Sequence, residues 1–196
     1  AGPVAEELYR GCRGFIQTDD YAGYNALFRG GGAVRVGCWD HVRRYFVEAQ
    51  PVAGKDCVTV LQEIAELYKL ECKYKTLTVV ERQAARDKHS RKLIESLKTR
   101  LDALNQRVLP KSPFGEAIHY ALGQWDALTV FLEHGQVALS NAPIEREIRP
   151  IAVGRHNWHF AGSERGARWA ACLFSLIATC RSHGVNVFDY FSDVLR

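Results

Sequence analysis

Two adjacent aspartates, Asp19 and Asp20, follow a short apolar run in the stretch FIQTDDYAGY. Residues 15–18 predict a β-strand, so Asp19 stands at a strand's carboxyl end, where α/β folds collect ligand-facing side chains. A carboxylate there can bind Mg²⁺, because this hard cation prefers oxygen ligands. The alternative is an aspartate that caps a helix starting near Tyr21, and Asp20 suits that position better. These residues alone leave both interpretations of Asp19 open.

Glu145, in the stretch NAPIEREIRP, is the second candidate acid. It falls in the first turn of a predicted helix, where the helix dipole favours an anion. Arg149 is four residues further on, so a surface ion pair is the alternative. Glu147 lies roughly 200° around the helix from Glu145, so only one of the two can face a given cleft.

Cys38 and His41, in CWDHVRR, have the spacing of half a zinc site. Such a site needs two more ligands, and the neighbouring sequence offers no second pair. We therefore expect a buried cysteine that ends a strand and a histidine in the first turn of the following helix. A sharper hypothesis places His41 in the same cleft as Asp19.

The stretch GRHNWHFAGSERGAR interleaves basic and aromatic residues, a pattern that suits phosphate contact and base stacking. A second basic stretch runs from Lys69 to Lys111, with twelve Lys or Arg against five acids. That stretch is either the solvated face of long helices or a track for a DNA backbone.

The elements that must position these residues are two strands near the start of the chain and helices in most of the remainder. We expect strands at 15–18 and 33–39, a helix at 40–49 and a break at 51–54. Helical periodicity then predicts three helices within 55–134. The remainder is expected to contain a short helix at 140–150, a loop at 151–166, and helices at 167–181 and 187–195.

Composition describes an ordinary globular chain. Its 196 residues are 47% hydrophobic and 24% charged, with a net charge of +4 that is compatible with nucleic acid. No apolar run approaches the roughly 18 residues of a membrane span, and no signal-peptide pattern begins the chain. We therefore expect a cytoplasmic location and six reduced cysteines. Because methionine is absent, we expect a fragment or a processed chain.

Four stretches in this order carry a more specific signal: QTDDYAGYNAL, GCWDHVRRYF, SNAPIEREIRPIAVGRHNWHFAGSERGAR and SLIATCRSHGVNVFDYFSDVL. Through them the whole chain resembles the C-terminal part of a bacterial transposase of insertion-sequence family sixty-six, a DDE-type transposase. The resemblance implies an α/β fold, with a partial RNase H-like core and a large all-helical insertion. We expect the core at 1–54 and 135–196, and the insertion at 55–134.

The resemblance also implies a two-metal DNA cleavage and strand-transfer reaction. In such families three acids hold two Mg²⁺ or Mn²⁺ ions, which offset the charge that builds on the attacking and leaving oxygens. By motif position Asp19 matches the second acid and Glu145 the third. The first acid is expected upstream of residue 1, so we expect this chain to be catalytically incomplete by itself.

Further positions follow from the same resemblance. Cys38, His41 and Asn141 are expected to support the active site. Ser140-Asn141-Ala142 stands where the family usually has Asp-Asn-Asn, and Asp20 replaces a common glycine. The residues expected to contact DNA are Arg43, Arg44, Arg146, Arg149, Arg155, Asn157, Trp158 and Arg165.

The partners implied are transposon ends and target DNA, further copies of the chain and accessory proteins of the same element. No membrane is implied, and the location would be the bacterial cytoplasm at the nucleoid. Two alternatives stay open. One is a non-catalytic DNA-binding or regulatory protein that works through residues 69–111 and 146–168, and the other is a decayed transposase remnant.

Overall fold

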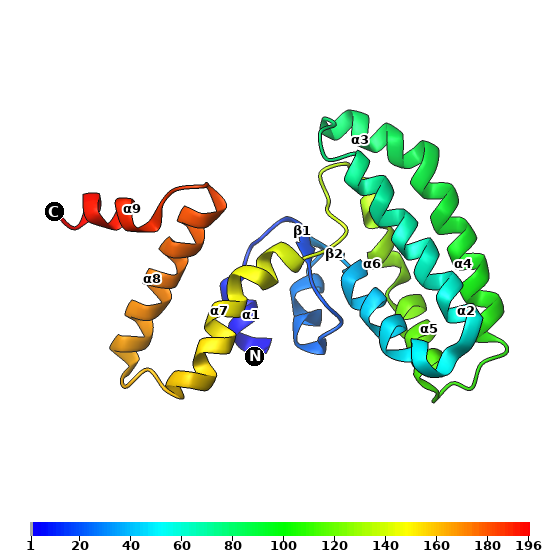
Figure 1. Ribbon diagram of the computed structural model, residues 1–196, viewed down its shortest axis with the longest axis horizontal. Coiled ribbons are helices and arrows are strands. Elements are labelled where there is room, and N and C mark those ends of the chain that lie inside the picture. Colours follow the sequence, from blue (N-terminus) through cyan, green and yellow to red (C-terminus); the bar gives the residue numbers. More distant parts are fainter. Residues whose placement is uncertain (1) are drawn as a thin grey trace. The chain divides into compact units, whose positions relative to one another are not determined.

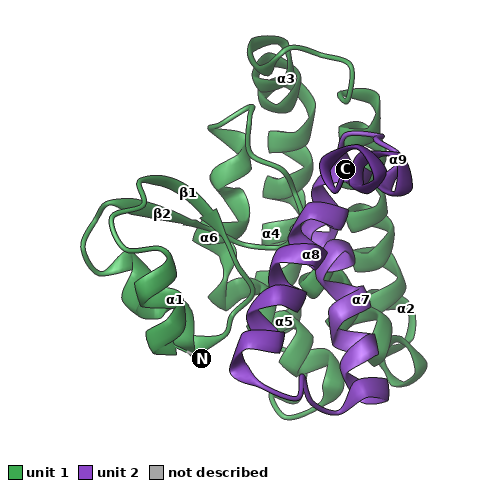
Figure 2. Ribbon diagram, turned by 90° about the vertical axis from the view of Figure 1, so that its left-hand side faces the viewer, with its two compact units in different colours: residues 1–141 green, residues 142–196 purple. Residues whose placement is uncertain are grey.

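The computed structural model describes residues 2–196, which divide into two compact units with the boundary between Asn141 and Ala142 (Figure 2). We call them unit 1 and unit 2. Unit 1 contains, in chain order (Figure 1), α1 (Gly2–Leu8), β1 (Gly14–Gln17), η1 (Ala22–Phe28), β2 (Ala33–Val36), α2 (Trp39–Lys73), α3 (Val79–Ala85), η2 (Arg86–Ser90), α4 (Arg91–Asn105), α5 (Pro113–Gly123), α6 (Trp125–Thr129) and η3 (Val130–Leu132). Unit 2 contains α7 (Ala142–Trp158), α8 (Glu164–Ser182) and α9 (Val187–Val194).

The two predicted strands form a parallel pair. Gly14 pairs with Ala33 and Gln17 with Val36, and the 3₁₀ helix η1 lies between the strands in the chain. Gly14 has φ +96°, a conformation that suits glycine and lets the chain turn into β1. The coarse prediction of a mostly helical α/β chain is thereby confirmed.

Helix α2 is longer than predicted because it continues through the expected break at 51–54. Pro51 lies inside the helix and Gly54 departs from helical geometry, with φ +67° and ψ −155°. Proline removes one backbone donor, and glycine adopts a positive φ without a Cβ penalty, so the break becomes a kink.

The core of unit 1 lies where α2, α4 and α5 pack together (Figure 1). Buried side chains recur at helical spacing on each helix, and the fully buried ones include Phe46, Ile64, Leu67, Leu97, Leu101 and Ile118. Trp39 is also buried, and its indole donates to the Leu128 carbonyl at 3.0 Å. This contact fixes the start of α2 against α6.

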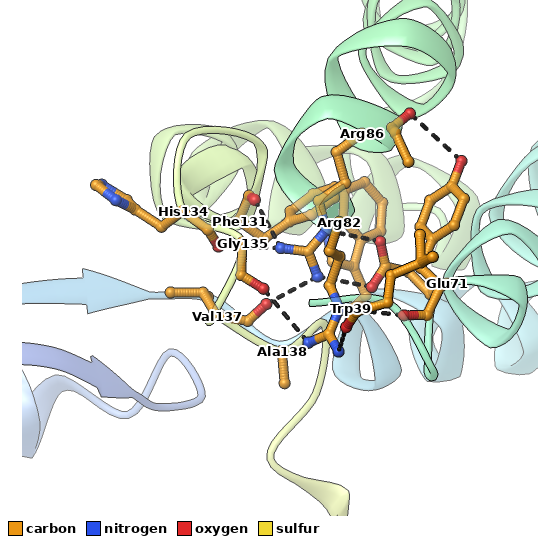
Figure 3. Close-up of polar contacts among 12 residues, drawn as sticks. Trp39, Glu71, Arg82, Arg86, Phe131, His134, Gly135, Val137 and Ala138 are labelled. Atoms are coloured by element: carbon orange, nitrogen blue, oxygen red, sulfur yellow. Dashed lines mark hydrogen bonds and ion pairs between the residues drawn. The ribbon is translucent and has the colours of Figure 1, made fainter. Parts of the chain in front are cut away.

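Arg86 is a second, polar centre of unit 1 (Figure 3). Its side chain is 1% exposed and forms a bidentate ion pair with Glu71, at 2.8 and 2.6 Å. The remaining donors reach the carbonyls of Phe131, His134 and Val137 at 2.9, 3.0 and 2.9 Å. All five guanidinium N–H groups are therefore used, which is what a buried cation requires.

Residues 135–140, which we call the connecting segment, lead from this centre to the boundary of unit 1. Carbonyls along the segment accept hydrogen bonds from different elements, and the donor–acceptor pairs are Arg82–Gly135 (3.4 Å), Arg86–Val137 (2.9 Å), Gln17–Ala138 (3.0 Å) and the Trp39 N–H with Leu139 (2.9 Å). Arg82 and Arg86 approach the segment from the same side (Figure 3). These hydrogen bonds hold the backbone of the connecting segment in place up to Ser140, the residue before Asn141.

Unit 2 differs from the prediction at the loop expected over 151–166. Helix α7 continues through Pro150 to Trp158, and only residues 159–163 separate it from α8. Pro150 cannot donate a backbone hydrogen bond, so the helix loses one internal contact there. The last turn of α7 nevertheless packs on α8, because Trp158 stacks on Phe174 with ring centroids 5.4 Å apart. No helix in residues 2–196 is long and apolar enough to cross a membrane.

Candidate active site and nucleic-acid surface

Asp19 lies immediately beyond the end of the parallel pair. The Thr18 N–H donates to the Val36 carbonyl at 3.0 Å, which extends the pairing up to Asp19. Asp19 Oδ1 then accepts from the Tyr21 N–H at 3.1 Å and closes an Asx turn. The prediction that Asp20 has this capping role is wrong, because the chain bends one residue earlier. The turn orients the Asp19 carboxylate.

Asp20 is held by two side chains that no sequence pattern connects with it. Arg35 on β2 forms an ion pair with Asp20 Oδ1 at 3.3 Å, and Gln124 Nε2 donates to the same oxygen at 2.5 Å. Arg35 also donates to the Asp19 carbonyl at 2.7 Å. The two adjacent carboxylates therefore have different partners, and Arg35 offsets the charge of Asp20.

Helix α5 brings a tyrosine close to this pair of acids. Tyr120 stacks on Tyr45 with ring centroids 4.3 Å apart. Burial, followed by the negative charges of Asp20 and Asp19, raises the pKa of Tyr120 to about 12. Tyr120 on α5 and Gln124, the residue that follows α5, thus both lie close to the turn at Asp19 and Asp20. The helical part of unit 1 therefore contributes side chains to this turn, which no short motif could indicate.

Cys38 and His41 are where the sequence placed them, the first just beyond β2 and the second in the first turn of α2, and both are buried. The Cys38 thiol lies 3.6 Å from Ser140 Oγ. Among residues 2–196, no group of three or more His, Cys, Asp or Glu side chains is arranged to hold a metal ion.

Asp40 connects Ser140 with a partly buried tyrosine. Ser140 Oγ donates to Asp40 Oδ2 at 2.5 Å, and the Tyr68 hydroxyl donates to Asp40 Oδ1. Burial and the hydrogen bond to Asp40 raise the pKa of Tyr68. A carboxylate thus lies beside Ser140 even though residue 140 is not an acid.

Glu145 occupies the first turn of α7, as the sequence predicted. It lines a shallow pocket of about 400 Å³ together with Arg146 and Arg149, two of the residues predicted to contact DNA. Asn141 is half-buried at the end of unit 1. Asp19 belongs to unit 1 and Glu145 to unit 2, so their pairing at one metal site stays a prediction.

The basic stretch from Lys69 to Lys111 is largely committed to the fold. Arg82 and Arg86 bind backbone carbonyls. Four more cations form ion pairs, namely Lys69 with Glu66, Arg91 with Asp87 and Glu133, Lys98 with Asp102, and Arg100 with Glu63. Six of the twelve basic residues therefore have intramolecular partners. This favours a structural interpretation of the stretch over a DNA track.

The other predicted DNA contacts are exposed. Arg43 and Arg44 lie on the solvent side of α2, and Arg155, Asn157 and Arg165 are exposed in unit 2. Trp158 is only partly available because one face of its ring is stacked on Phe174.

Gly154 makes room for this Trp158 ring, because a Cβ at residue 154 would lie 2.3 Å from the ring. Gly154→Ala is therefore expected to displace the ring from Phe174 and to lower the thermal midpoint of unfolding and the near-ultraviolet circular dichroism. The lost stack should outweigh the gain of about 1 kcal/mol that alanine usually gives in a helix. The control is Gly123→Ala in α5, where a Cβ meets nothing within 4 Å. An unchanged or higher midpoint for Gly154→Ala would contradict the packing described.

Comparison with known proteins identifies a family and several relatives. The model of the family described as "Transposase IS66 family" matches residues 1–169. Three proteins of Sinorhizobium fredii (strain NBRC 101917 / NGR234) are similar over almost the whole chain. They are the uncharacterized proteins y4jD (30% identical, 98% of this chain and 39% of the relative), y4hP (32%, 99% and 38%) and y4qI (32%, 98% and 37%). The chain thus spans less than two-fifths of the length of these relatives. No solved structure matches it.

Proposed function

The chain belongs to the IS66 transposase family, and from this premise we propose that it is part of a DDE-type catalytic domain that cleaves and transfers DNA strands. The observation that carries the proposal is the position of Asp19. It lies two residues beyond the end of β1 of a parallel pair and is oriented by an Asx turn, while Arg35 offsets the charge of its neighbour Asp20. A metal-dependent nuclease site needs several carboxylates, and an oriented acid at a strand end can supply one of them.

We further propose that β1 and β2 belong to an RNase H-like core. In this proposal residues 1–54 and 135–196 contribute to the core, and residues 55–134 form a helical insertion. The parallel pair supports the assignment of a core, and the packing of α4 and α5 on α2 supports a helical segment attached to it.

Asp19 and Glu145 are proposed to hold Mg²⁺ or Mn²⁺ together with a first acid that the resemblance expects upstream. Both are carboxylates, the donors that hard cations prefer, and the hydrogen bond to Tyr21 uses one of the two Asp19 oxygens. When bound, the cations would supply activation of the attacking oxygen and stabilisation of charge on the phosphodiester.

The surrounding residues have supporting roles in this proposal. Arg35 holds the backbone of Asp19, while Cys38, His41 and Asn141 shape the site's surroundings. Asp40, which accepts from Ser140 Oγ, supplies a carboxylate near the position where the family usually has one. The contacts to DNA phosphates and bases are assigned to Arg43, Arg44, Arg146, Arg149, Arg155, Asn157, Trp158 and Arg165.

The proposed partners are transposon ends and target DNA, with further copies of the protein and accessory proteins of the same element. Such a reaction would take place in the bacterial cytoplasm at the nucleoid. Exposed cations on α2 and in unit 2 support DNA as the partner.

The direct test is DNA cleavage by a longer form of the protein that includes the first acid. With supercoiled plasmid carrying the element's ends, nicking is expected in Mg²⁺ or Mn²⁺ and is expected to disappear in EDTA, because the carboxylates cannot replace the cations' charge. Adding excess Mg²⁺ back should restore it. Equal nicking in EDTA would contradict a metal-dependent mechanism, and salt-dependent DNA binding without any nicking would favour a regulatory protein.

A further inference from the structure

The turn between α7 and α8, residues 159–163, presents an aromatic side chain to solvent. Phe160 is 81% exposed, more than any other large hydrophobic side chain in residues 2–196. A single exposed apolar residue is not unusual by itself, so its neighbours decide the interpretation.

The backbone at Phe160 is held in an uncommon conformation. The Phe160 N–H donates to the Trp158 carbonyl at 2.7 Å, and His159 between them has φ +63°. A hydrogen bond across one residue of positive φ is the pattern of a γ-turn, which is rare and strained for a residue with a side chain. The strain arises because the chain turns sharply just after Trp158. This turn places Phe160 beyond the end of α7.

Trp158 and Phe160 therefore have different environments although both lie in the basic and aromatic stretch. The Trp158 ring stacks on Phe174 at an interplanar angle of 12° and lies over Gly154. It helps to hold α7 against α8. Phe160 has no ring contact within unit 2, among the residues that the structure describes, and its faces are available to a partner.

The charge around the turn is positive. No acid occurs between Arg149 and Ser163, and the next acid, Glu164, forms an ion pair with Arg168 at 2.7 Å. Arg155 and Arg165, five residues before and after Phe160, are both exposed. An exposed ring with an exposed arginine on either side of it in the sequence suits a ligand with flat apolar faces on an anionic chain.

We propose that this turn binds unpaired nucleotides of DNA, with Phe160 stacked on a base and with Arg155 and Arg165 on the neighbouring phosphates. Bases in a duplex are covered on both faces by adjacent pairs, whereas a strand end or an unpaired tail exposes them. Phenylalanine has no hydrogen-bonding group, so the contact tolerates any base. The choice of DNA as the partner rests on the proposed function, since strand cleavage creates such ends.

The test uses the 196-residue chain and two DNA probes, a blunt duplex and the same duplex with a single-stranded tail that contains 2-aminopurine. The parent chain is expected to bind the tailed probe more tightly and to change the 2-aminopurine fluorescence. Phe160→Ala should lower affinity for the tailed probe about tenfold, with no change in salt dependence, because one base–aromatic stack is lost. Phe160→Tyr should keep the parent behaviour.

The arginines are expected to show the opposite pattern. The double variant Arg155→Gln/Arg165→Gln should reduce the magnitude of the slope of log affinity against log salt concentration by about 1.4, which corresponds to the loss of two phosphate contacts on a single strand. It should keep the preference for the tailed probe. The matched control is Phe188→Ala, which removes a 77% exposed ring beside Asp189 on α9 and should leave both properties unchanged.

The inference is overturned if the parent chain shows no preference for the tailed probe, or if Phe160→Ala binds both probes like the parent. Circular dichroism of Phe160→Ala should match that of the parent, because an exposed side chain in a turn contributes little to packing. Neither result bears on metal-dependent cleavage, which is measured on the longer form. A failure of this inference is therefore distinguishable from a failure of the proposed function.

Discussion

Asp19→Asn and Glu145→Gln are each expected to abolish metal-dependent DNA cleavage by the longer form of the protein, by about three orders of magnitude or more. An amide is close to a carboxylate in size, but it lacks the charge that holds a divalent cation. Asparagine also supports an Asx turn, so the hydrogen bond to the Tyr21 N–H is retained. The loss would therefore report on metal chemistry rather than on folding. The measurement is plasmid nicking across a Mn²⁺ titration, with thermal unfolding followed in parallel.

Asp20→Asn is the matched control for this prediction. It changes the neighbouring carboxylate in the same way, but that carboxylate is occupied by Arg35 and Gln124. We expect most of the nicking activity to remain. If Asp20→Asn were inactive and Asp19→Asn active, the roles of the two aspartates would be reversed, and activity in Glu145→Gln would remove Glu145 from the site.

The parts of unit 1 that could be predicted from sequence are governed by local rules. Apolar spacing located the helices of the core, and Phe15 and Ile16 after Gly14 indicated β1. Thr78 and Glu81 form a capping box at the start of α3, a signal that lies within four residues. Each of these features depends on neighbours in the chain, so each leaves a pattern.

The parts that could not be predicted depend on contacts across long separations. Asp20 and Gln124 are 104 residues apart, so nothing beside Asp20 indicates that its carboxylate has a partner just after α5. Helix α7 continues past Pro150 because Trp158 packs on Phe174, and local propensity does not include that contact. The same limit applies to unit 2 as a whole, where the exposed Phe160 and the packed Trp158 have similar sequence surroundings.

Arg86 is the clearest case, because in the sequence it is one cation among many in a basic stretch. In the structure it is 1% exposed and links Glu71 to two carbonyls just before the connecting segment, those of Phe131 and His134, and to the Val137 carbonyl within it (Figure 3). We therefore expect Arg86→Met to lower the free energy of unfolding of unit 1 by about 3–5 kcal/mol. The cost arises because the largely buried Glu71 carboxylate loses its counter-ion and the carbonyls lose their donors. Urea unfolding followed by circular dichroism measures it.

Two further variants separate this buried network from an ordinary ion pair. Arg100→Met breaks the pair with Glu63, in which the arginine side chain is 40% exposed, and should cost at most about 1 kcal/mol. Arg86→Met combined with Glu71→Leu removes both charges and should recover part of the lost stability, but the carbonyls stay without donors. A cost for Arg86→Met no larger than that for Arg100→Met would mean that the connecting segment is held mainly by Gln17 and Trp39. A double variant as unstable as Arg86→Met would place the cost in the carbonyls rather than in Glu71.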